Sequence, residues 1–163
     1  RDTGPRVPPQ GTTTKGCMKI SAKARYAVRL LLDLAMNQNQ GPVRTASLAE
    51  HTGISVRFIE QILQPLKRDG LVKSTRGAAG GYLLSADPRD ISIARIVRVI
   101  EGTISLALCC DDPSTCKRSP VCSSHKAWVR ATQVLEAELE AITIAQMQEG
   151  LPAEPVAQAR GKN

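Results

Sequence analysis

Two short amphipathic segments on either side of Gly53 constrain the fold of this chain most strongly. Ser47 is a candidate N-cap residue, Glu50 stands where it would complete a capping box, and Gly53 is typical of a helix end. Ser55 is the expected cap of the next helix, whose apolar residues recur at helical spacing: Ile59, Ile62, Leu63 and Leu66. Pro65 is expected to kink this helix or to end it early. Two helices joined through a glycine turn, the second polar on its outer face, predict a helix-turn-helix unit.

The flanking segments predict the rest of a compact module. Helical periodicity over residues 20–37, stopped by Gly41 and Pro42, predicts a first core helix. Residues 71–87, LVKSTRGAAGGYLLSAD, place two short apolar runs around a glycine-rich tip that carries Lys73 and Arg76, which predicts a two-stranded wing. Residues 91–101 predict a further amphipathic helix. The expected fold class is therefore mainly α with a small β-wing, a winged helix-turn-helix domain over residues 18–101 followed by a long C-terminal helix.

Both ends of the chain differ from this module in composition. Residues 1–17 are rich in Pro, Gly and Thr and precede Met18, which we interpret as the natural start. Cys17 has no assigned role. The residues 149–163 are again rich in Pro, Ala and Gly. Both segments are expected to be disordered extensions.

The distribution of charge points to a polyanionic partner. The formal net charge is +7, and residues 19–100 hold 13 Lys and Arg against 6 Asp and Glu, whereas residues 101–163 hold 6 against 8. A basic module joined to a mildly acidic one suggests that the first contacts nucleic acid, although a solvated basic surface would look the same by charge alone.

The cysteines favour metal or redox chemistry. The chain has no apolar run long enough to span a membrane and no secretory signal, so we expect a cytoplasmic, nucleoid-associated protein. In a reducing compartment, five cysteines are not expected to form a disulfide framework.

Three of these cysteines and a histidine share one short segment, within residues 102–125. Cys110, Cys116 and Cys122 are separated by five residues each, and His125 follows after two more. Three thiolates and an imidazole are a metal-site composition, which suits an iron-sulfur cluster or Zn²⁺, and a thiol redox switch is a further alternative. Zinc sites usually show closer cysteine pairs. Cys109 could replace Cys110 as the first ligand, but the regular spacing favours Cys110.

The residues 123–148 predict a long helix with an apolar stripe too wide for one packing surface. Ser123 or Ser124 is the expected cap of this helix. The stripe predicts a homodimer held by this dimerisation helix through Trp128, Leu135, Leu139 and Ile142, and packing of the helix on its own domain is the alternative.

Four ordered motifs resemble one family of bacterial regulators. KISAKARYAV in the first helix, SVRFIEQIL in the second helix of the helix-turn-helix, STRGAAGGYLL in the wing and the three-cysteine segment together resemble the Rrf2 family, and its IscR-like iron-sulfur subgroup in particular. The resemblance covers about residues 18–148. It implies a [2Fe-2S] cluster on Cys110, Cys116, Cys122 and His125, with a [4Fe-4S] cluster or Zn²⁺ as alternatives. NsrR-like members use an acidic residue of the first helix as a ligand, and Arg25 stands at that position here, which argues against an NsrR-like [4Fe-4S] site.

The resemblance also implies a DNA-binding surface. Ser55, Arg57, Glu60 and Gln61 would face the major groove of double-stranded operator DNA, where such side chains can read base edges. Lys73 and Arg76 lie on the wing, and Arg76 would enter the minor groove. Gly77, Gly80 and Gly81 would let the wing backbone approach the phosphates.

The expected function is a DNA-binding transcriptional repressor that senses iron-sulfur, iron or redox status through its cluster. A cluster-free or zinc-bound repressor controlled by a partner protein is the alternative. An enzyme is not expected, because His51 is the sole histidine outside the candidate ligands and no phosphate-binding loop or acid/base constellation is present.

Overall fold

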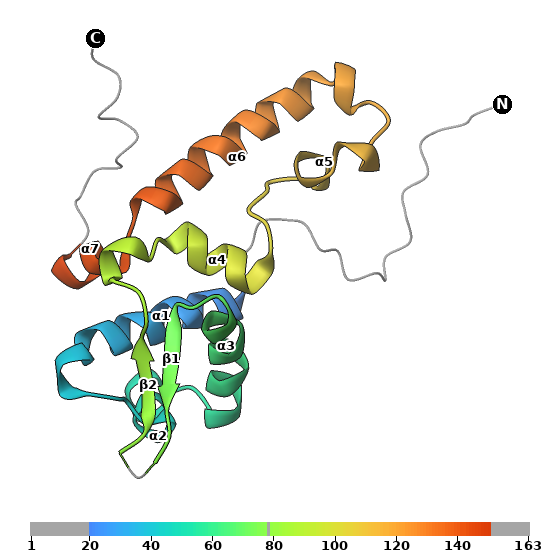
Figure 1. Cartoon of the computed structure of the whole chain (residues 1–163). Helices are drawn as coiled ribbons and strands as arrows, with labels where there is room; N and C mark the ends of the chain where they lie inside the picture. The colour runs from blue at the N-terminus through green and yellow to red at the C-terminus, as the bar shows by residue number, and fades with distance from the viewer. Residues whose placement is uncertain (1–19, 78, 151–163) are drawn as a thin grey trace.

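The structure, a computed structural model, describes residues 20–77 and 79–150 (Figure 1). The predictions for residues 1–17 and for residues 151–163 of the C-terminal segment fall outside this range. The described elements are, in chain order, α1 (Ala22–Met36), η1 (Gln38–Gln40), α2 (Thr45–Thr52), α3 (Val56–Arg68), β1 (Val72–Thr75), β2 (Gly81–Leu84), η2 (Pro88–Asp90), α4 (Ile93–Glu101), α5 (Leu108–Asp111), η3 (Pro113–Thr115), η4 (Ser119–Val121), α6 (Ser123–Ala141) and α7 (Ile144–Glu149). A mainly helical chain with a small antiparallel wing is the fold class that the sequence predicts.

Helix α1 forms the centre of the hydrophobic core. Ser21 caps it by accepting a hydrogen bond from the amide of Ala24 at 3.1 Å. Its buried positions follow helical spacing and pack with residues of α3, α4 and α7. They are Ala24, Ala27, Leu30, Leu31, Leu34 and Ala35. Burial of this stripe removes enough apolar surface from water to hold the four helices together.

Helix α2 begins earlier than the sequence predicts. Arg44 is its N-cap residue, so the predicted cap at Ser47 is wrong and Glu50 lies too far into the helix to complete a capping box. The reason is tertiary: Val43 exchanges two backbone hydrogen bonds with Tyr82 at 2.8 and 2.9 Å, which keeps the chain extended until Arg44. The helix ends at Gly53, whose φ of 70° is a left-handed conformation that glycine adopts without strain.

Helix α3 runs through its proline. Ser55 caps it as predicted, with its hydroxyl accepting from the amide of Phe58 at 3.4 Å. Pro65 does not end the helix, which continues to Arg68. The missing proline N–H would have bonded the carbonyl of Gln61, which is an exposed residue. The α2–turn–α3 arrangement is thus the predicted helix-turn-helix.

Strands β1 and β2 form the wing. They pair antiparallel from Val72 opposite Leu84 to Thr75 opposite Gly81. The buried side chains of Val72 and Leu84 fix the base of the hairpin to the core, while its tip extends away from the helices (Figure 1). Gly77 at the tip has a φ of 106°, which favours glycine.

The C-terminal helical segment folds back onto the module. The single helix predicted over residues 123–148 is wrong, because it is broken between α6 and α7. Thr143 and Gln146 form a capping box that starts α7. The amide of Ile93 donates to the carbonyl of Ile142 and the amide of Ile144 donates to the carbonyl of Ile91, both at 2.9 Å. Ile144 is fully buried, so α7 closes the core over α1.

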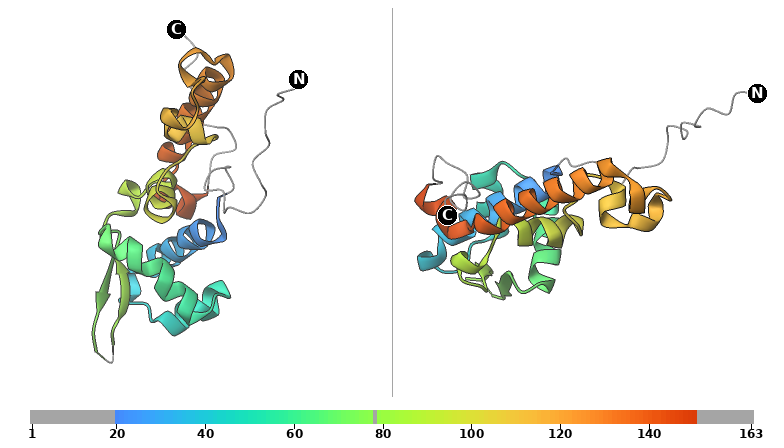
Figure 2. Two further views of the ribbon diagram at one scale, coloured as in Figure 1. Left: turned by 90° about the vertical axis from the view of Figure 1, so that its right-hand side faces the viewer. Right: turned by 90° about the horizontal axis from the view of Figure 1, so that it is seen from above.

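The wing and the cysteine segment lie at opposite ends of the molecule. Figure 1 shows the wing tip at the bottom and α5 with the first turns of α6 at the top, and the side view in Figure 2 shows the same separation. None of the described helices is long and apolar enough to cross a membrane.

Candidate DNA-binding surface and metal centre

The exposed face of α3 gathers most of the candidate base-reading residues. Arg57, Glu60 and Gln61 are exposed and line one shallow surface hollow. Ser55 is exposed at the start of the same helix. Base-edge recognition requires donors and acceptors on an unobstructed helix face, and this face offers both.

Four further residues complete this hollow. Leu63 belongs to the apolar stripe of α3, and the other three were missed by the sequence analysis: Gln64, Lys67 and Tyr82. The ammonium of Lys67 donates to the hydroxyl of Ser74 on β1, so it ties the helix to the wing. Gln64 and Lys67 follow Arg57 and Glu60 at helical spacing, a signal that could have identified them. Tyr82 comes from β2, and only the tertiary structure brings it here.

The wing carries exposed cations and closely packed glycines. Lys73 on β1 and Arg76 at the tip are both exposed. A Cβ atom on Gly80 would lie 2.4 Å from the carbonyl oxygen of Thr75, and one on Gly81 would lie 2.5 Å from the carbonyl oxygen of Val43. These glycines therefore have a packing role within the chain itself, whatever they do near phosphates.

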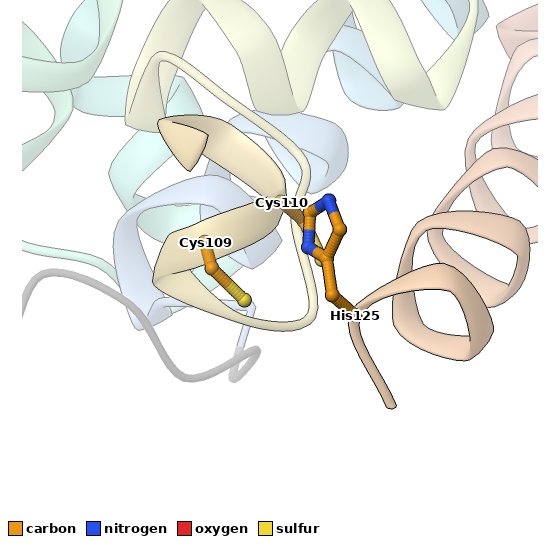
Figure 3. Close-up of side chains that lie close together, drawn as sticks. All are labelled: Cys109, Cys110 and His125. Carbon is orange, nitrogen blue, oxygen red and sulfur yellow. The ribbon is translucent and has the colours of Figure 1, made fainter. Parts of the chain in front are cut away.

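The second candidate site lies where α5 meets the start of α6. Cys109 and Cys110 are on α5, and His125 reaches toward them from the first turn of α6 (Figure 3). Their ligand atoms, two Sγ and one ring nitrogen, all lie within 4.8 Å of one another. The Nδ1 atom of His125 is buried and finds no hydrogen-bond partner within the described part of the chain. An orphaned imidazole nitrogen beside two thiols fits a metal or cluster, because coordination would satisfy it.

The structure brings together two of the four predicted ligands. Cys110 and His125 are in this group, whereas Cys116 and Cys122 are not. Cys116 is exposed and follows η3, and Cys122 is the N-cap residue of α6, where Ser123 or Ser124 was expected. The amide of Lys126 donates to the carbonyl of Cys122 at 3.3 Å, which sets the helix start at that residue.

The segment between these cysteines is folded upon itself by local hydrogen bonds. The side chain of Asp112 accepts from the amide of Ser114 at 2.9 Å. The hydroxyl of Ser119, which is 4% exposed, donates to the carbonyl of Pro113 at 2.8 Å. These short connections keep Cys116 and Cys122 on one compact loop, within reach of α5.

The surroundings of the thiols shift their acidity in opposite directions. Partial burial, together with the neighbouring thiol of Cys110, raises the pKa of Cys109, and the charge of Cys116 adds a smaller effect. The backbone amide of His125, helped by Ser124, lowers the pKa of Cys122 at the start of α6.

A polar connection links the cysteine end to the winged module. The guanidinium of Arg98 on α4 donates to Glu136 at 2.8 Å and to Glu140 at 3.0 Å, both on α6. Arg98 and Glu136 line one surface pocket together with Cys110. The carboxylates also raise the pKa of Arg98, which keeps it charged.

The apolar stripe of α6 is divided between two surfaces. Leu135, Leu139 and Ile142 pack against the chain's own core. Trp128 and Val134 remain 50% and 54% exposed. Of the four residues predicted at a dimer interface, Trp128 is thus the one that this chain leaves uncovered.

The amino-acid sequence of the described fold matches a known family. The family model "Rrf2: Iron-dependent Transcriptional regulator" matches residues 20–150. This chain belongs to the Rrf2 family. The match includes α3, the wing and the cysteine segment, so this Rrf2 chain is a DNA-binding transcriptional regulator and not an enzyme.

Relatives of this Rrf2 regulator include proteins named IscR and a protein named CymR. The transcriptional regulator IscR of Klebsiella pneumoniae strain 342 is 34% identical over 130 residues, which are 80% of this chain and 79% of that protein. The structure of T. potens IscR matches with a TM-score of 0.67 and 33% identity over 90% of this chain and 93% of that one. CymR, the global cysteine regulator of B. subtilis, matches with a TM-score of 0.69 and 32% identity over 81% and 97%.

Proposed function

We propose that this Rrf2 regulator carries a [2Fe-2S] cluster on Cys110, Cys116, Cys122 and His125, and that the cluster controls repression. The observation that carries the proposal is the buried, unpartnered Nδ1 of His125 beside the cysteine segment. The similarity to IscR supports it.

The chain's own residues suit this role. His125 supplies a neutral donor, and the lowered pKa of Cys122 leaves that residue ready to supply a thiolate at the positive end of α6. When bound, a cluster would supply a redox-active centre whose presence depends on iron and sulfide. Cys116 is exposed between η3 and η4, on the same loop as Cys122, and would complete the ligand set.

The test is anaerobic reconstitution with absorption spectroscopy and iron and sulfide analysis. We expect Cys110→Ala, Cys116→Ala and Cys122→Ala each to abolish the cluster while the helical content is kept, because the segment lies outside the core. Cys17→Ser is the matched control and should keep it. His125→Cys should retain a cluster with an altered spectrum and potential. Normal iron occupancy in all three alanine variants would refute the ligand set, and a colourless, zinc-loaded protein would favour the zinc-bound alternative.

We propose further that α3 and the wing read operator DNA from a homodimer. Ser55, Arg57, Glu60 and Gln61 would address the major groove, and Arg76 the minor groove, with Lys73 beside it. The exposure of these side chains and the +7 net charge support this assignment. The half-exposed Trp128 and Val134 favour pairing through residues 123–148. Residues 18–101 would then form the DNA-binding domain and residues 102–125 the cluster-binding loop, and the protein would work in the cytoplasm, associated with the nucleoid.

Two variants distinguish contacts that position the protein on DNA from contacts that read the bases. Arg76→Ala should weaken binding at every operator sequence and lower its salt dependence, because a cation is lost from the phosphate field. Glu60→Ala should keep its overall affinity but relax discrimination at the bases it faces by about 1–3 kcal/mol. The measurement is a binding series over single-base operator variants at several salt concentrations. If Glu60→Ala loses affinity uniformly and keeps its preferences, the placement of α3 is wrong.

A further inference from the structure

The cysteine segment holds one more thiol than the proposed cluster requires, and that thiol lies inside the site. Cys109 precedes Cys110 on α5, and its Sγ belongs to the group of ligand atoms that lie within 4.8 Å of one another. Cys122, by contrast, is outside that group although the proposed cluster uses it. The arrangement of the chain therefore favours a ligand set different from the one proposed for the cluster.

The three clustered groups have the chemistry of a mononuclear site. Two thiolates and one imidazole are typical ligands of Zn²⁺ and of similar divalent ions, and three protein ligands leave a fourth position for water. Ligand atoms around a tetrahedral zinc ion lie roughly 3.4–3.8 Å apart, as its bond lengths imply. Closing the present group around an ion thus needs displacements of about 1 Å, which small side-chain rotations provide.

The buried nitrogen of His125 points to the same conclusion. Its Nδ1 has no hydrogen-bond partner among the described residues, and a ring nitrogen of His125 lies within 4.8 Å of the Sγ atoms of both Cys109 and Cys110. A bound cation would satisfy this nitrogen and would replace the two thiol protons, which pass to solvent.

We propose that Cys109, Cys110 and His125 form a second ligand set, for one zinc-like divalent metal ion, which is occupied when no cluster is bound. Because Cys110 and His125 belong to both sets, the ion and the cluster exclude each other. Metal binding at this site does not depend on the proposed cluster, whereas the competition rests on it.

The test uses the full chain, freed of metal under anaerobic conditions, with Co²⁺ as a spectroscopic probe. We expect one Co²⁺ per chain with thiolate-to-metal charge-transfer absorption and the visible bands of a tetrahedral ion. Cys109→Ser should weaken the affinity for Co²⁺ at least about tenfold, since loss of even an outer-shell partner commonly costs that much. Cys122→Ser is the matched control and should bind Co²⁺ like the wild type.

Reconstitution with iron and sulfide should affect the two variants in the opposite way to Co²⁺ binding. Cys109→Ser should still assemble a cluster, and Cys122→Ser should not. Prior loading with Zn²⁺ should slow cluster assembly in the wild type and not in Cys109→Ser. Cys109→Ala, checked by circular dichroism, repeats the measurement without adding a hydroxyl.

The outcomes that overturn the inference differ from those that overturn the cluster. Wild-type Co²⁺ affinity in Cys109→Ser and Cys109→Ala refutes the second ligand set, and so does an equal loss of Co²⁺ in Cys122→Ser. Loss of the cluster in Cys109→Ser would make Cys109 a cluster ligand and would also refute a separate set. If no variant and no wild-type sample assembles a cluster while the Co²⁺ pattern holds, the metal site stands and the proposed cluster falls.

Discussion

Arg98→Ala is the substitution that most directly tests whether metal binding at the cysteine segment is coupled to DNA binding by the winged module. Arg98 lies on α4 in the winged module, and its guanidinium bonds Glu136 and Glu140 on α6. Its exposed fraction is 41%, and those of the two glutamates are 38% and 54%. These are partly solvated ion pairs, so each contributes only a little to stability.

The expected cost follows from that exposure. An exposed pair contributes about 0.2–1 kcal/mol, and two pairs that share one guanidinium should contribute roughly 0.5–1.5 kcal/mol to the free energy of unfolding. For a chain of this size, such a loss lowers the melting temperature by about 2–5 °C. The difference between Arg98→Ala and wild type should shrink as the salt concentration rises.

Arg95→Ala provides the matched control. Arg95 is also on α4 and pairs with Asp69 at 3.0 Å, each 39% exposed, but Asp69 follows α3 inside the winged module. Both variants should lose similar stability in urea denaturation. Metal binding and operator binding are coupled by a free energy, which is measured from the operator affinities of the metal-loaded and the metal-free protein. Only Arg98→Ala should reduce this coupling free energy, by about 0.5–2 kcal/mol.

The result that refutes this reasoning is a full response of DNA affinity to the metal in Arg98→Ala. An equal reduction in Arg95→Ala would also refute it, because the effect would then reflect lost stability and not the link between α4 and α6.

Three further outcomes are expected. In the metal-free protein, alkylation followed by mass spectrometry should modify Cys122 at lower pH than Cys109, because a lowered pKa gives thiolate at lower pH and a raised pKa delays it; identical pH profiles would contradict the opposite shifts. Trp128→Ser and Val134→Ser should weaken dimerisation in sedimentation experiments with little loss of monomer stability. Leu135→Ala should instead lower the free energy of unfolding by about 1–3 kcal/mol, because Leu135 packs on the core. A wild-type protein that sediments as a monomer would refute the interface. Gly81→Ala should destabilise the chain by about 1–3 kcal/mol, since its Cβ would lie 2.5 Å from the carbonyl oxygen of Val43; urea denaturation showing no loss would mean that the wing can shift.

The sequence predicts the elements whose boundaries are local. The cap at Ser55, the glycine end of α2 at Gly53 and the periodicity of α1, α3 and α4 are each determined by a few neighbouring residues. The start of α2 is not local, because the bridge between Val43 and Tyr82 decides it.

The break before α7 shows a different limit. Thr143 and Gln146 have the spacing of a capping box, so the signal was present in the sequence. Leu135, Leu139 and Ile142 follow one another at helical spacing, and this periodicity hides the break. The hydrogen bonds of Ile142 and Ile144 to Ile93 and Ile91 decide between the two patterns, and they join segments about fifty residues apart.

The candidate metal centre is likewise only partly predictable from the sequence. The regular spacing of Cys110, Cys116 and Cys122 identifies the segment and favours Cys110, but it does not reveal that Cys109 also lies beside His125. Helix α5 presents both Cys109 and Cys110 to His125, and that geometry appears only when α5 packs against α6.

The way α6 is held indicates how a bound metal or cluster would act on DNA binding. Its C-terminal end is fixed to the winged module by the bonds of Ile142 and Ile144, and its middle is fixed by Arg98. Its first turn meets mainly α5 and the cysteine segment, at the end of the molecule far from the wing (Figure 1). If α6 pairs two chains as proposed, a ligand that joins α5 to the first turn of α6 would stiffen the part of α6 that carries the exposed Trp128. It would then change how the two chains are spaced on an operator, and leave the α3 surface of each chain unaltered.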